Sequence, residues 1–439
     1  MSKELYFKDL DEIKCFLSKA ESFIFAGSKT STVISFDGLK ENQKILNLSQ
    51  LPKKLEFSEG VLVVEGPVSW QEASVYLESK GREIMAHPTD HCACVLAGLA
   101  TSATGERTFH YGPIRDQILW LEYMNNNGEI HRLDYNKDLL ELSLLRPFRE
   151  ELSLYQQQWK RYEGLKNAPY PRFERETDLM IGTEGQLGLI TKAAFKTAPR
   201  HTSHFLYIQT PRWQESFSQH KILLDFAHAN RESLLCAELL DANSLSFAPK
   251  ELRPFENGDL IFFEVDEPLI ETIYEKLALI EEIDTESIQV VSRNVCHELR
   301  VSIPRAVNER NARRGVLKKG TDAQVHPDQF EELIDIYRRL DEQGIDSILF
   351  GHFGDCHLHF NFLLSAEQEK KCYDLLTNFY QQIQKLNGSP FAEHGIGTIK
   401  LEYITDFYPE IVKRVFSLLK KECDPNNIFF PMGFMGNRG

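Results

Sequence analysis

The stretch IGTEGQLGLIT, residues 181–191, sets three glycines in a short turn and then continues into apolar residues typical of a strand. Small residues let backbone N–H groups approach the oxygens of a ligand, and hydroxyl side chains add further donors. Two other turns share this composition: FAGSKTSTV at 25–33 and LATSATGERTFHYG at 99–112. None fits G-x-G-x-x-G at the start of a helix or G-x-x-x-x-G-K-[ST], which argues against a Rossmann site or a P-loop. Taken singly, each is better explained as a structural turn than as a ligand cradle.

Composition indicates an ordinary globular protein of two or three domains. The chain has 439 residues, 42% hydrophobic and 26% charged, and a formal net charge of −15, which argues against nucleic-acid binding because phosphates require clustered basic residues. No apolar run resembles a signal peptide or approaches the roughly 18 residues of a transmembrane span. The eight cysteines are scattered without C-x-x-C, so neither a zinc ribbon nor an iron–sulfur site is expected and a reducing cytoplasm is predicted.

The order of patterns predicts a domain boundary near Pro199. Before it, strand and helix patterns alternate as in an α/β domain, with Ser69 as a helix N-cap and a hairpin through Asn127-Gly128. Residues 136–178 are charged and Gln-rich, and we interpret them as a surface excursion from this domain. After residue 200, strands interleave with amphipathic helices, which predicts a sheet with helices over one face. The expected division is 1–198, 199–422 and a terminal segment 423–439.

The stretch GHFGDCHLHFNF, residues 351–362, holds three histidines in an otherwise strand-like run. His352 and His359 are seven positions apart, so on one straight strand they face opposite sides. They could share a metal ion only if the chain bends, and Gly354-Asp355 supplies favoured turn residues. His357 and His359 lie on one face and could form a ligand pair unaided. For any single histidine here, a hydrogen-bonded residue near the core remains the better interpretation.

Together and in this order, the three turns resemble those of FAD-linked enzymes typified by vanillyl-alcohol oxidase and p-cresol methylhydroxylase. IGTEGQLGLIT resembles G-S-E-G-T-L-G-I-I-T, residues 27–31 loosely resemble R-G-G-G-T-S, and the segment from residue 100 resembles A-T-N-A-S-G…Y-G…R-D. In the carboxyl half, GHFGDCHLHFN is similar to G-H-x-G-D-G-N-x-H-x-N, and FAEHGIGTIK at 391–400 to E-H-G-I-G…K. CDPNNIFFPMGF at 423–434 is similar to D-P-N-N-I-x-N-P-G. These belong to the branch that oxidises D-2-hydroxy acids, which includes D-lactate and D-2-hydroxyglutarate dehydrogenases and the glycolate oxidase flavin subunit.

The resemblance covers nearly the whole chain, with several departures. Ser28 and Lys29 replace glycines of the phosphate loop, and Ser102 replaces an asparagine. Phe430 and His357 also stand where the family has asparagine. The resemblance thus implies that His357 is an additional histidine, which would either strengthen metal binding at this stretch or compete for the ion.

The resemblance implies an α+β protein: a two-part α/β FAD-binding domain of the vanillyl-alcohol oxidase type, followed by a ferredoxin-like substrate domain with an antiparallel sheet and covering helices. It implies FAD as cofactor. The residues expected to contact FAD are Gly27, Ser28, Lys29, Thr30, Ser31, Pro88, Thr89, Thr101, Ser102, Thr104, Gly105, Gly182, Glu184, Gly188 and Ile190.

The resemblance also implies a metal site and catalytic residues. His352, His359 and Glu393 match the family's ligands for Zn²⁺ or Mn²⁺, a set that leaves a coordination position open. His394 matches a general base, and Asn361 lies near the substrate. Arg300 matches the arginine that grips the substrate carboxylate.

The expected activity is oxidation of a small D-2-hydroxy acid to the 2-oxo acid. Electrons pass to a separate acceptor: a quinone, an electron-transfer flavoprotein, a cytochrome or oxygen. A homodimer and a peripheral position on the inner face of a membrane stay open. Two alternatives are a metal-free flavin oxidase or dehydrogenase of an alcohol or aldehyde, and a catalytically impaired FAD-binding protein. A flavin-free zinc hydrolase is more distant.

Overall fold

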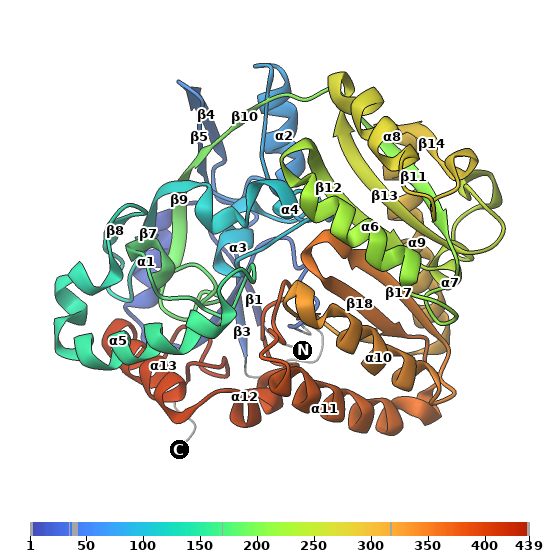
Figure 1. Cartoon of the computed structure of the whole chain (residues 1–439). Helices are drawn as coiled ribbons and strands as arrows, with labels where there is room; N and C mark the ends of the chain where they lie inside the picture. The colour runs from blue at the N-terminus through green and yellow to red at the C-terminus, as the bar shows by residue number, and fades with distance from the viewer. Residues whose placement is uncertain (1–2, 35, 37–42, 169, 317, 437–439) are drawn as a thin grey trace. The chain divides into compact units, whose positions relative to one another are not determined.

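The computed structural model describes residues 3–34, 36, 43–168, 170–316 and 318–436. The chain forms two compact units that alternate along the sequence. The first unit contains residues 1–105, 112–200 and 391–439, and the second contains residues 106–111 and 201–390. The return to the first unit therefore begins at Phe391, earlier than the segment 423–439 expected from the sequence. Helices and antiparallel strands occur in both units, in agreement with the predicted α+β class (Figure 1).

The first unit contains a parallel sheet and a larger antiparallel one. The parallel sheet has the order β1-β3-β2 and the larger sheet the order β4-β5-β9-β7-β8, with a short pair β10-β6 beside them in the described part of the chain. Their bounds are β1 Lys3–Tyr6, β2 Phe23–Ala26, β3 Lys44–Asn47, β4 Lys54–Ser58, β5 Val61–Glu65, β6 Arg82–Glu83, β7 Ile118–Met124, β8 Ile130–Asp134, β9 Leu189–Lys196 and β10 Ala198–Pro199. The helices are α1 Leu10–Leu17, α2 Trp70–Glu78, α3 Val95–Ala100, α5 Arg149–Gln158, α12 Leu401–Phe407 and α13 Glu410–Cys423.

Local signals in the first unit act as predicted. Ser69 caps α2 through a capping box with Glu72, in which each side chain accepts a hydrogen bond from the other residue's backbone N–H. The β7–β8 hairpin turns through Asn127-Gly128, and Gly128 takes a left-handed backbone angle, φ +76°. These two signals depend on residues close in sequence, which is why the sequence alone could predict them.

The core of the first unit joins both ends of the chain. Phe16 of α1 packs edge-on against Phe23 of β2, and Phe23 packs against Phe429 near the carboxyl terminus. The backbone N–H of Phe23 donates to Ile428, and that of Phe430 donates back to Phe23. Residues 428–430 thus lie alongside β2 and form a parallel bridge with it.

The predicted surface excursion has a packed core. Helix α5 buries Leu152 and Tyr155, and the rings of Tyr155 and Phe173 each lie 6.3 Å from the ring of Phe416 in α13. Residues 136–178 therefore cover the carboxyl-terminal helix. The charges in the sequence mark only the exposed side of this layer.

The second unit is built on one antiparallel sheet of order β14-β11-β13-β12-β17-β18-β15, with β16 also paired to β18. The strands are β11 Ser203–Thr210, β12 Leu234–Leu240, β13 Asp259–Asp266, β14 Gln289–Ser292, β15 Lys319–Gly320, β16 Ala323–Gln324, β17 Ser347–His352 and β18 His357–Phe362. The helices are α4 Thr108–Tyr111, α6 Ser218–Ala229, α7 Ala242–Leu245, α8 Ile270–Ala278, α9 Arg293–Arg314, α10 Phe330–Asp341 and α11 Glu369–Lys385.

Helices cover both faces of this sheet, so the prediction of one covered face was wrong. Phe262 and Phe263 are neighbours on β13 and point to opposite faces. Phe262 belongs to a core cluster with Cys296 and Leu299 of α9. Phe263 stacks on Phe226 of α6, with ring centroids 5.8 Å apart. An amphipathic pattern shows that a helix packs on the sheet but carries no information about which face it takes.

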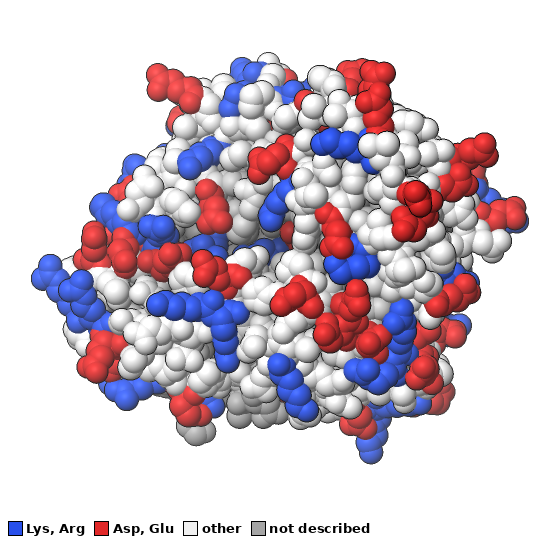
Figure 2. All heavy atoms as spheres, in the orientation of Figure 1, with Lys and Arg blue, Asp and Glu red and all other residues white. Residues whose placement is uncertain are grey.

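The surface carries charges of both signs. On the face drawn in Figure 2, acidic and basic side chains are interspersed. Among the residues described, each helix is too short or too polar to cross a bilayer.

Candidate functional site

In the first unit the three small-residue turns meet at helix α3. Backbone N–H groups of the turn 182–184 donate to the carbonyls of Leu99 and Ala100, at 3.2 and 2.8 Å. At the other end of the helix, the hydroxyl of Ser28 lies 3.2 Å from the sulfur of Cys94, which precedes α3. Segments 27–31, 101–105 and 182–190, far apart in sequence, are thus neighbours in space.

Two glycines make this arrangement possible. A Cβ on Gly105 would lie 1.8 Å from the carbonyl oxygen of His87, so this position brings residues 87–89 against the turn at 101–105. A Cβ on Gly188 would lie 2.8 Å from the ring of Tyr123 on β7. A side chain at either position requires the backbone or a buried ring to move. Pro88 and Thr89, also predicted to contact FAD, are therefore held beside Gly105.

Thr104 provides a test of whether the turns fit a ligand. Its hydroxyl is fully buried and has no hydrogen-bond partner in the part of the chain that is described. Burying a hydroxyl without a partner costs about 1–3 kcal/mol, so such groups usually have one. A cofactor that carries many oxygen and nitrogen acceptors, as FAD does, fits this position.

Other predicted contacts are already engaged within the protein. The hydroxyl of Ser102 donates to the Oδ1 of Asn167 at 2.7 Å. Lys29 forms an ion pair with Glu4 at 2.7 Å. Both residues replace family residues of the phosphate-binding segments, and each is held by a partner that the sequence did not reveal.

Glu184 ties the loop 391–400 to the turn at 182–190. Its buried carboxylate accepts hydrogen bonds from the backbone N–H groups of Ile396 at 2.7 Å and Gly397 at 2.9 Å. Burial raises the pKa of Glu184 to about 7, even though these hydrogen bonds act to lower it. Glu393 and His394, both half-buried, lie in this same loop and belong to the first unit.

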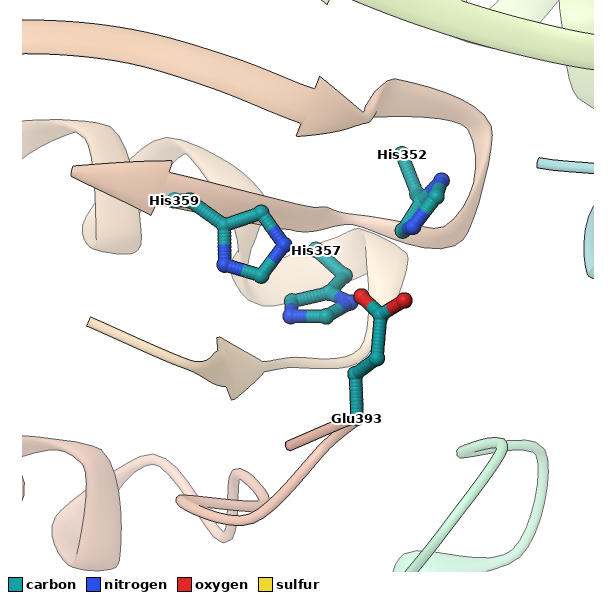
Figure 3. A group of neighbouring side chains, drawn as sticks. All are labelled: His352, His357, His359 and Glu393. Carbon is teal, nitrogen blue, oxygen red and sulfur yellow. The ribbon is translucent and has the colours of Figure 1, made fainter. Parts of the chain in front are cut away.

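In the second unit, strands β17 and β18 form a hairpin that gathers the three histidines (Figure 3). Gly354 and Asp355 lie in its turn, as predicted. His352 pairs directly with His357 across the hairpin, and His359 follows two positions along β18. Cross-strand partners and alternate residues share a face of a sheet, so all three imidazoles point the same way. His357, which the family resemblance leaves out of the ligand set, belongs to the same group.

The imidazoles are close enough to serve one ion. One ring nitrogen from each of His352, His357 and His359 lies within 4.8 Å of the other two. All three side chains are buried. A hairpin face in the interior of a sheet is usually apolar, so three imidazoles here call for a ligand or for buried polar partners. A ligand at this position is consistent with the metal ion that the family resemblance implies.

Each histidine has a polar partner on a neighbouring segment. The Nδ1 of His352 lies 2.8 Å from the carboxylate of Glu238, and the Nε2 of His357 lies 3.1 Å from the carboxylate of Asp322. The Nδ1 of His359 lies 3.2 Å from the carbonyl oxygen of Thr321.

The sequence analysis missed all three partners. Glu238 gave a usable signal, since it is the one charged residue in the buried strand LLCAELL and a buried charge requires a partner. Asp322 and Thr321 lie in a loop-like stretch that pairs with β18 only in the folded chain, and no local pattern indicated them.

Arg300 on α9 is half-buried and lies between two carboxylates. Its guanidinium contacts Glu106 and lies 3.7 Å from Glu238, the partner of His352. Burial acts to lower the pKa of Arg300, but the two carboxylates more than offset this and raise it. The arginine is therefore held charged, and Glu238 links it to His352 of the histidine hairpin.

Asn361 lies on the same face of β18 as His357 and His359, and its amide donates to the backbone oxygen of His359 at 3.0 Å. The predicted site residues thus fall into two groups. The first unit holds the FAD turns with Glu393 and His394, and the second holds the hairpin with Arg300 and Asn361.

Two domain families match the chain in this order. Residues 8–134 match the FAD binding domain, and residues 218–432 match the C-terminal domain of FAD linked oxidases. A solved structure of alkyldihydroxyacetonephosphate synthase superposes with a TM-score of 0.66 over 97% of this chain and 75% of that one, at 13% identity. At that identity the likeness concerns the fold alone.

The curated relatives are distant in sequence. The mitochondrial D-2-hydroxyglutarate dehydrogenase of Arabidopsis thaliana is 27% identical over 418 residues, and the probable enzyme of that name from Oryza sativa subsp. japonica is 24% identical over 408 residues. Each alignment covers 89% of this chain and 66% of the relative, slightly less than two thirds. A D-lactate dehydrogenase of Anaerostipes hadrus is 23% identical, covering 88% of this chain and 79% of the relative. With both domains matched in order and the fold in agreement, the chain belongs to the family of FAD-linked oxidases.

Proposed function

We propose that this protein oxidises a small D-2-hydroxy acid to the 2-oxo acid and passes the electrons to a separate acceptor. The observation that carries the proposal is the pairing of an FAD-binding domain with a second unit that presents three buried histidines and a half-buried arginine. Relatives named for D-2-hydroxyglutarate and D-lactate support the substrate class. FAD supplies the acceptor for the hydride that leaves the substrate Cα.

The residues of the second unit suit recognition of a hydroxy acid. Arg300 offers a planar guanidinium to the substrate carboxylate, and Asn361 offers an amide on the hairpin face. Glu106 and Glu238 hold the guanidinium in place. A substrate carboxylate would share Arg300 with these two acids, so binding is expected to depend on salt and on the geometry of this arginine.

We further propose that His352, His359 and Glu393 hold a Zn²⁺ or Mn²⁺ ion. Two imidazoles and a carboxylate are suitable donors and would leave a coordination position open for the substrate hydroxyl. When bound, such an ion would supply a Lewis acid for the substrate hydroxyl group. His394 would accept the hydroxyl proton as the general base.

Anaerobic reduction of the bound flavin tests the function. The purified yellow protein is mixed with a panel of D- and L-2-hydroxy acids without oxygen, and the loss of flavin absorbance is followed. A D acid should bleach the flavin and its L enantiomer should not. If none of the acids bleaches the flavin, the proposed substrate class is wrong.

Two variants on the same helix locate the carboxylate site. Arg300→Lys keeps the charge but loses the paired hydrogen bonds, so it should raise the KM for the acid with flavin content unchanged. Arg313→Lys is the control, because Arg313 is 80% exposed on α9. Equal KM values for both variants would remove Arg300 from substrate binding.

The metal site has its own test. Metal content is measured for the wild type and for His359→Ala after loading with Zn²⁺ or Mn²⁺. The wild type should retain one ion per chain and the variant should lose it. Equal metal content in the two proteins would contradict the proposed metal site but not the flavin-dependent oxidation.

A further inference from the structure

We propose that His357 is a third imidazole ligand, bound through Nδ1, and that Asp322 is the residue that positions it. The inference rests on the metal part of the proposed function and deepens it. The second unit alone would then offer three nitrogen donors to one divalent cation, whereas the family resemblance assigns two histidines to the metal. His357, Asp322 and the other two histidines all lie within the second unit.

The hairpin register places His357 among the other two rings. His357 lies directly across from His352 and two positions before His359. Its ring centroid is 5.5 Å from that of His352 and 4.5 Å from that of His359. Nitrogen atoms bound to one tetrahedral zinc ion lie about 3.3 Å apart, given bonds of about 2.0–2.1 Å. One ring nitrogen from each histidine lies within 4.8 Å of the other two, so the rings would have to draw closer by about 1.5 Å at most to share one ion.

The hydrogen bonds fix which nitrogen of each ring can bind a metal. A carboxylate or a carbonyl oxygen only accepts, so the ring nitrogen facing it carries the hydrogen. In the neutral imidazole the lone pair is then on the other nitrogen. For His352 and His359, whose Nδ1 atoms face Glu238 and Thr321, this nitrogen is Nε2. For His357, whose Nε2 faces Asp322, it is Nδ1.

This is the hydrogen-bond pattern of metal-binding histidines. Such residues donate their second ring N–H to a carboxylate or a backbone carbonyl, which fixes the tautomer and the ring orientation. Here all three histidines do so, His352 to Glu238 on β12 and the other two to the adjacent residues Asp322 and Thr321. Asp322 is itself 1% exposed and His357 is fully buried, so the pair is held rigidly and shielded from water.

A purely structural role for His357 makes different predictions. A buried histidine–aspartate pair that only supports the fold would change stability when removed but not the affinity for metal. The chain contains such a pair in the same unit: His220 is fully buried, and its Nε2 lies 3.1 Å from the carboxylate of Asp259. His220 therefore serves as a matched control.

Zinc affinity is the first test. The flavin-loaded protein is stripped of metal, and its Zn²⁺ dissociation constant is measured by competition with a chromophoric chelator. Asp322→Asn should weaken binding about 10- to 100-fold, as expected for loss of a residue that orients a ligand, and His357→Asn should weaken it at least as much. His220→Asn should bind as the wild type does. Wild-type affinity in His357→Asn would overturn the inference.

A measurement on the wild type covers the case in which these variants do not fold. Protein with ¹⁵N-labelled histidine is loaded with ¹¹³Cd²⁺, and one-bond couplings identify the ligating nitrogens. We expect one Nδ1, from His357, and two Nε2. Couplings to two Nε2 atoms alone would overturn the inference and leave the proposed metal site intact. If the wild type binds neither Zn²⁺ nor Cd²⁺, both metal proposals are wrong, and flavin bleaching still tests the oxidation independently.

Discussion

Removing the buried guanidinium of Arg107 is expected to destabilise the second unit strongly. Arg107 lies in the segment 106–111, and its Nε and Nη2 atoms donate to the two carboxylate oxygens of Glu264 at 2.8 and 2.6 Å. The two side chains are only 5% and 2% exposed. Arg107→Met leaves the carboxylate buried without its charged partner, and of its side-chain donors described here the hydroxyl of Ser203 remains. The loss of the charged partner costs about 3–5 kcal/mol of unfolding free energy. For a domain of about 150–250 residues this lowers Tm by roughly 6–20 °C.

The loss should depend on pH in a defined direction. In the wild type, burial acts to raise the pKa of Glu264, but Arg107 more than offsets this and holds the pKa below its ordinary value. The pair's contribution is therefore complete above the unfolded pKa of about 4.3 and is lost as the pH falls through the lower folded value. In Arg107→Met burial acts without this offset, so the folded pKa rises and the penalty disappears as the pH falls. The difference in unfolding free energy between the wild type and Arg107→Met should therefore become smaller from pH 7 towards pH 4.5.

Urea unfolding followed by tryptophan fluorescence at several pH values measures both effects. The double variant Arg107→Met/Glu264→Gln is the control, because it removes the buried charge together with its partner and should recover most of the loss. A single variant that loses less than about 1 kcal/mol, or a double variant as unstable as the single one, would refute the reasoning.

Three further outcomes follow from the first unit. Gly105→Ala should lower the unfolding free energy by about 1–3 kcal/mol, because its Cβ would meet the carbonyl of His87 at 1.8 Å; unchanged urea unfolding would contradict the close approach. Thr104→Val should weaken FAD binding about 2- to 12-fold in a flavin-fluorescence titration without destabilising the apoprotein, because its buried hydroxyl has no partner among the described residues; equal FAD affinity would count against a contact there. The pKa of Glu184 is raised to about 7, so stability should fall as the pH rises from about 4.3 to 7 and stay low above it. Glu184→Gln should remove that slope, and a slope that persists in the variant would assign it to another group.

The sequence predicted the parts of the site that depend on neighbours along the chain. The turn at Gly354-Asp355 was predicted because glycine and aspartate favour turns, and the structure places both residues in the hairpin turn. The glycine turn at 182–188 was likewise predicted from its own composition. The side-chain types at these positions limit the backbone so strongly that a short window is sufficient.

Features that depend on strand pairing could not be predicted in this way. Glu238 reaches His352 because β12 pairs with β17, which lies more than a hundred residues later in the sequence. Asp322 reaches His357 because the short strand β16 pairs with β18. Pairing of distant strands is set by the whole sheet, so neither carboxylate could be assigned to its histidine from the sequence.

The interleaving of the two units has a consequence for synthesis. Chains fold as they emerge from the ribosome, and domains near the amino terminus usually fold first. Here residues 391–439 belong to the first unit, and Phe429 packs on Phe23 within its core. The second unit has all of its residues, including 106–111, once position 390 has emerged. The unit that begins the chain is therefore the last to be completed. A chain that stops at residue 390 lacks a part of the FAD-binding unit even though residues 8–134 are intact.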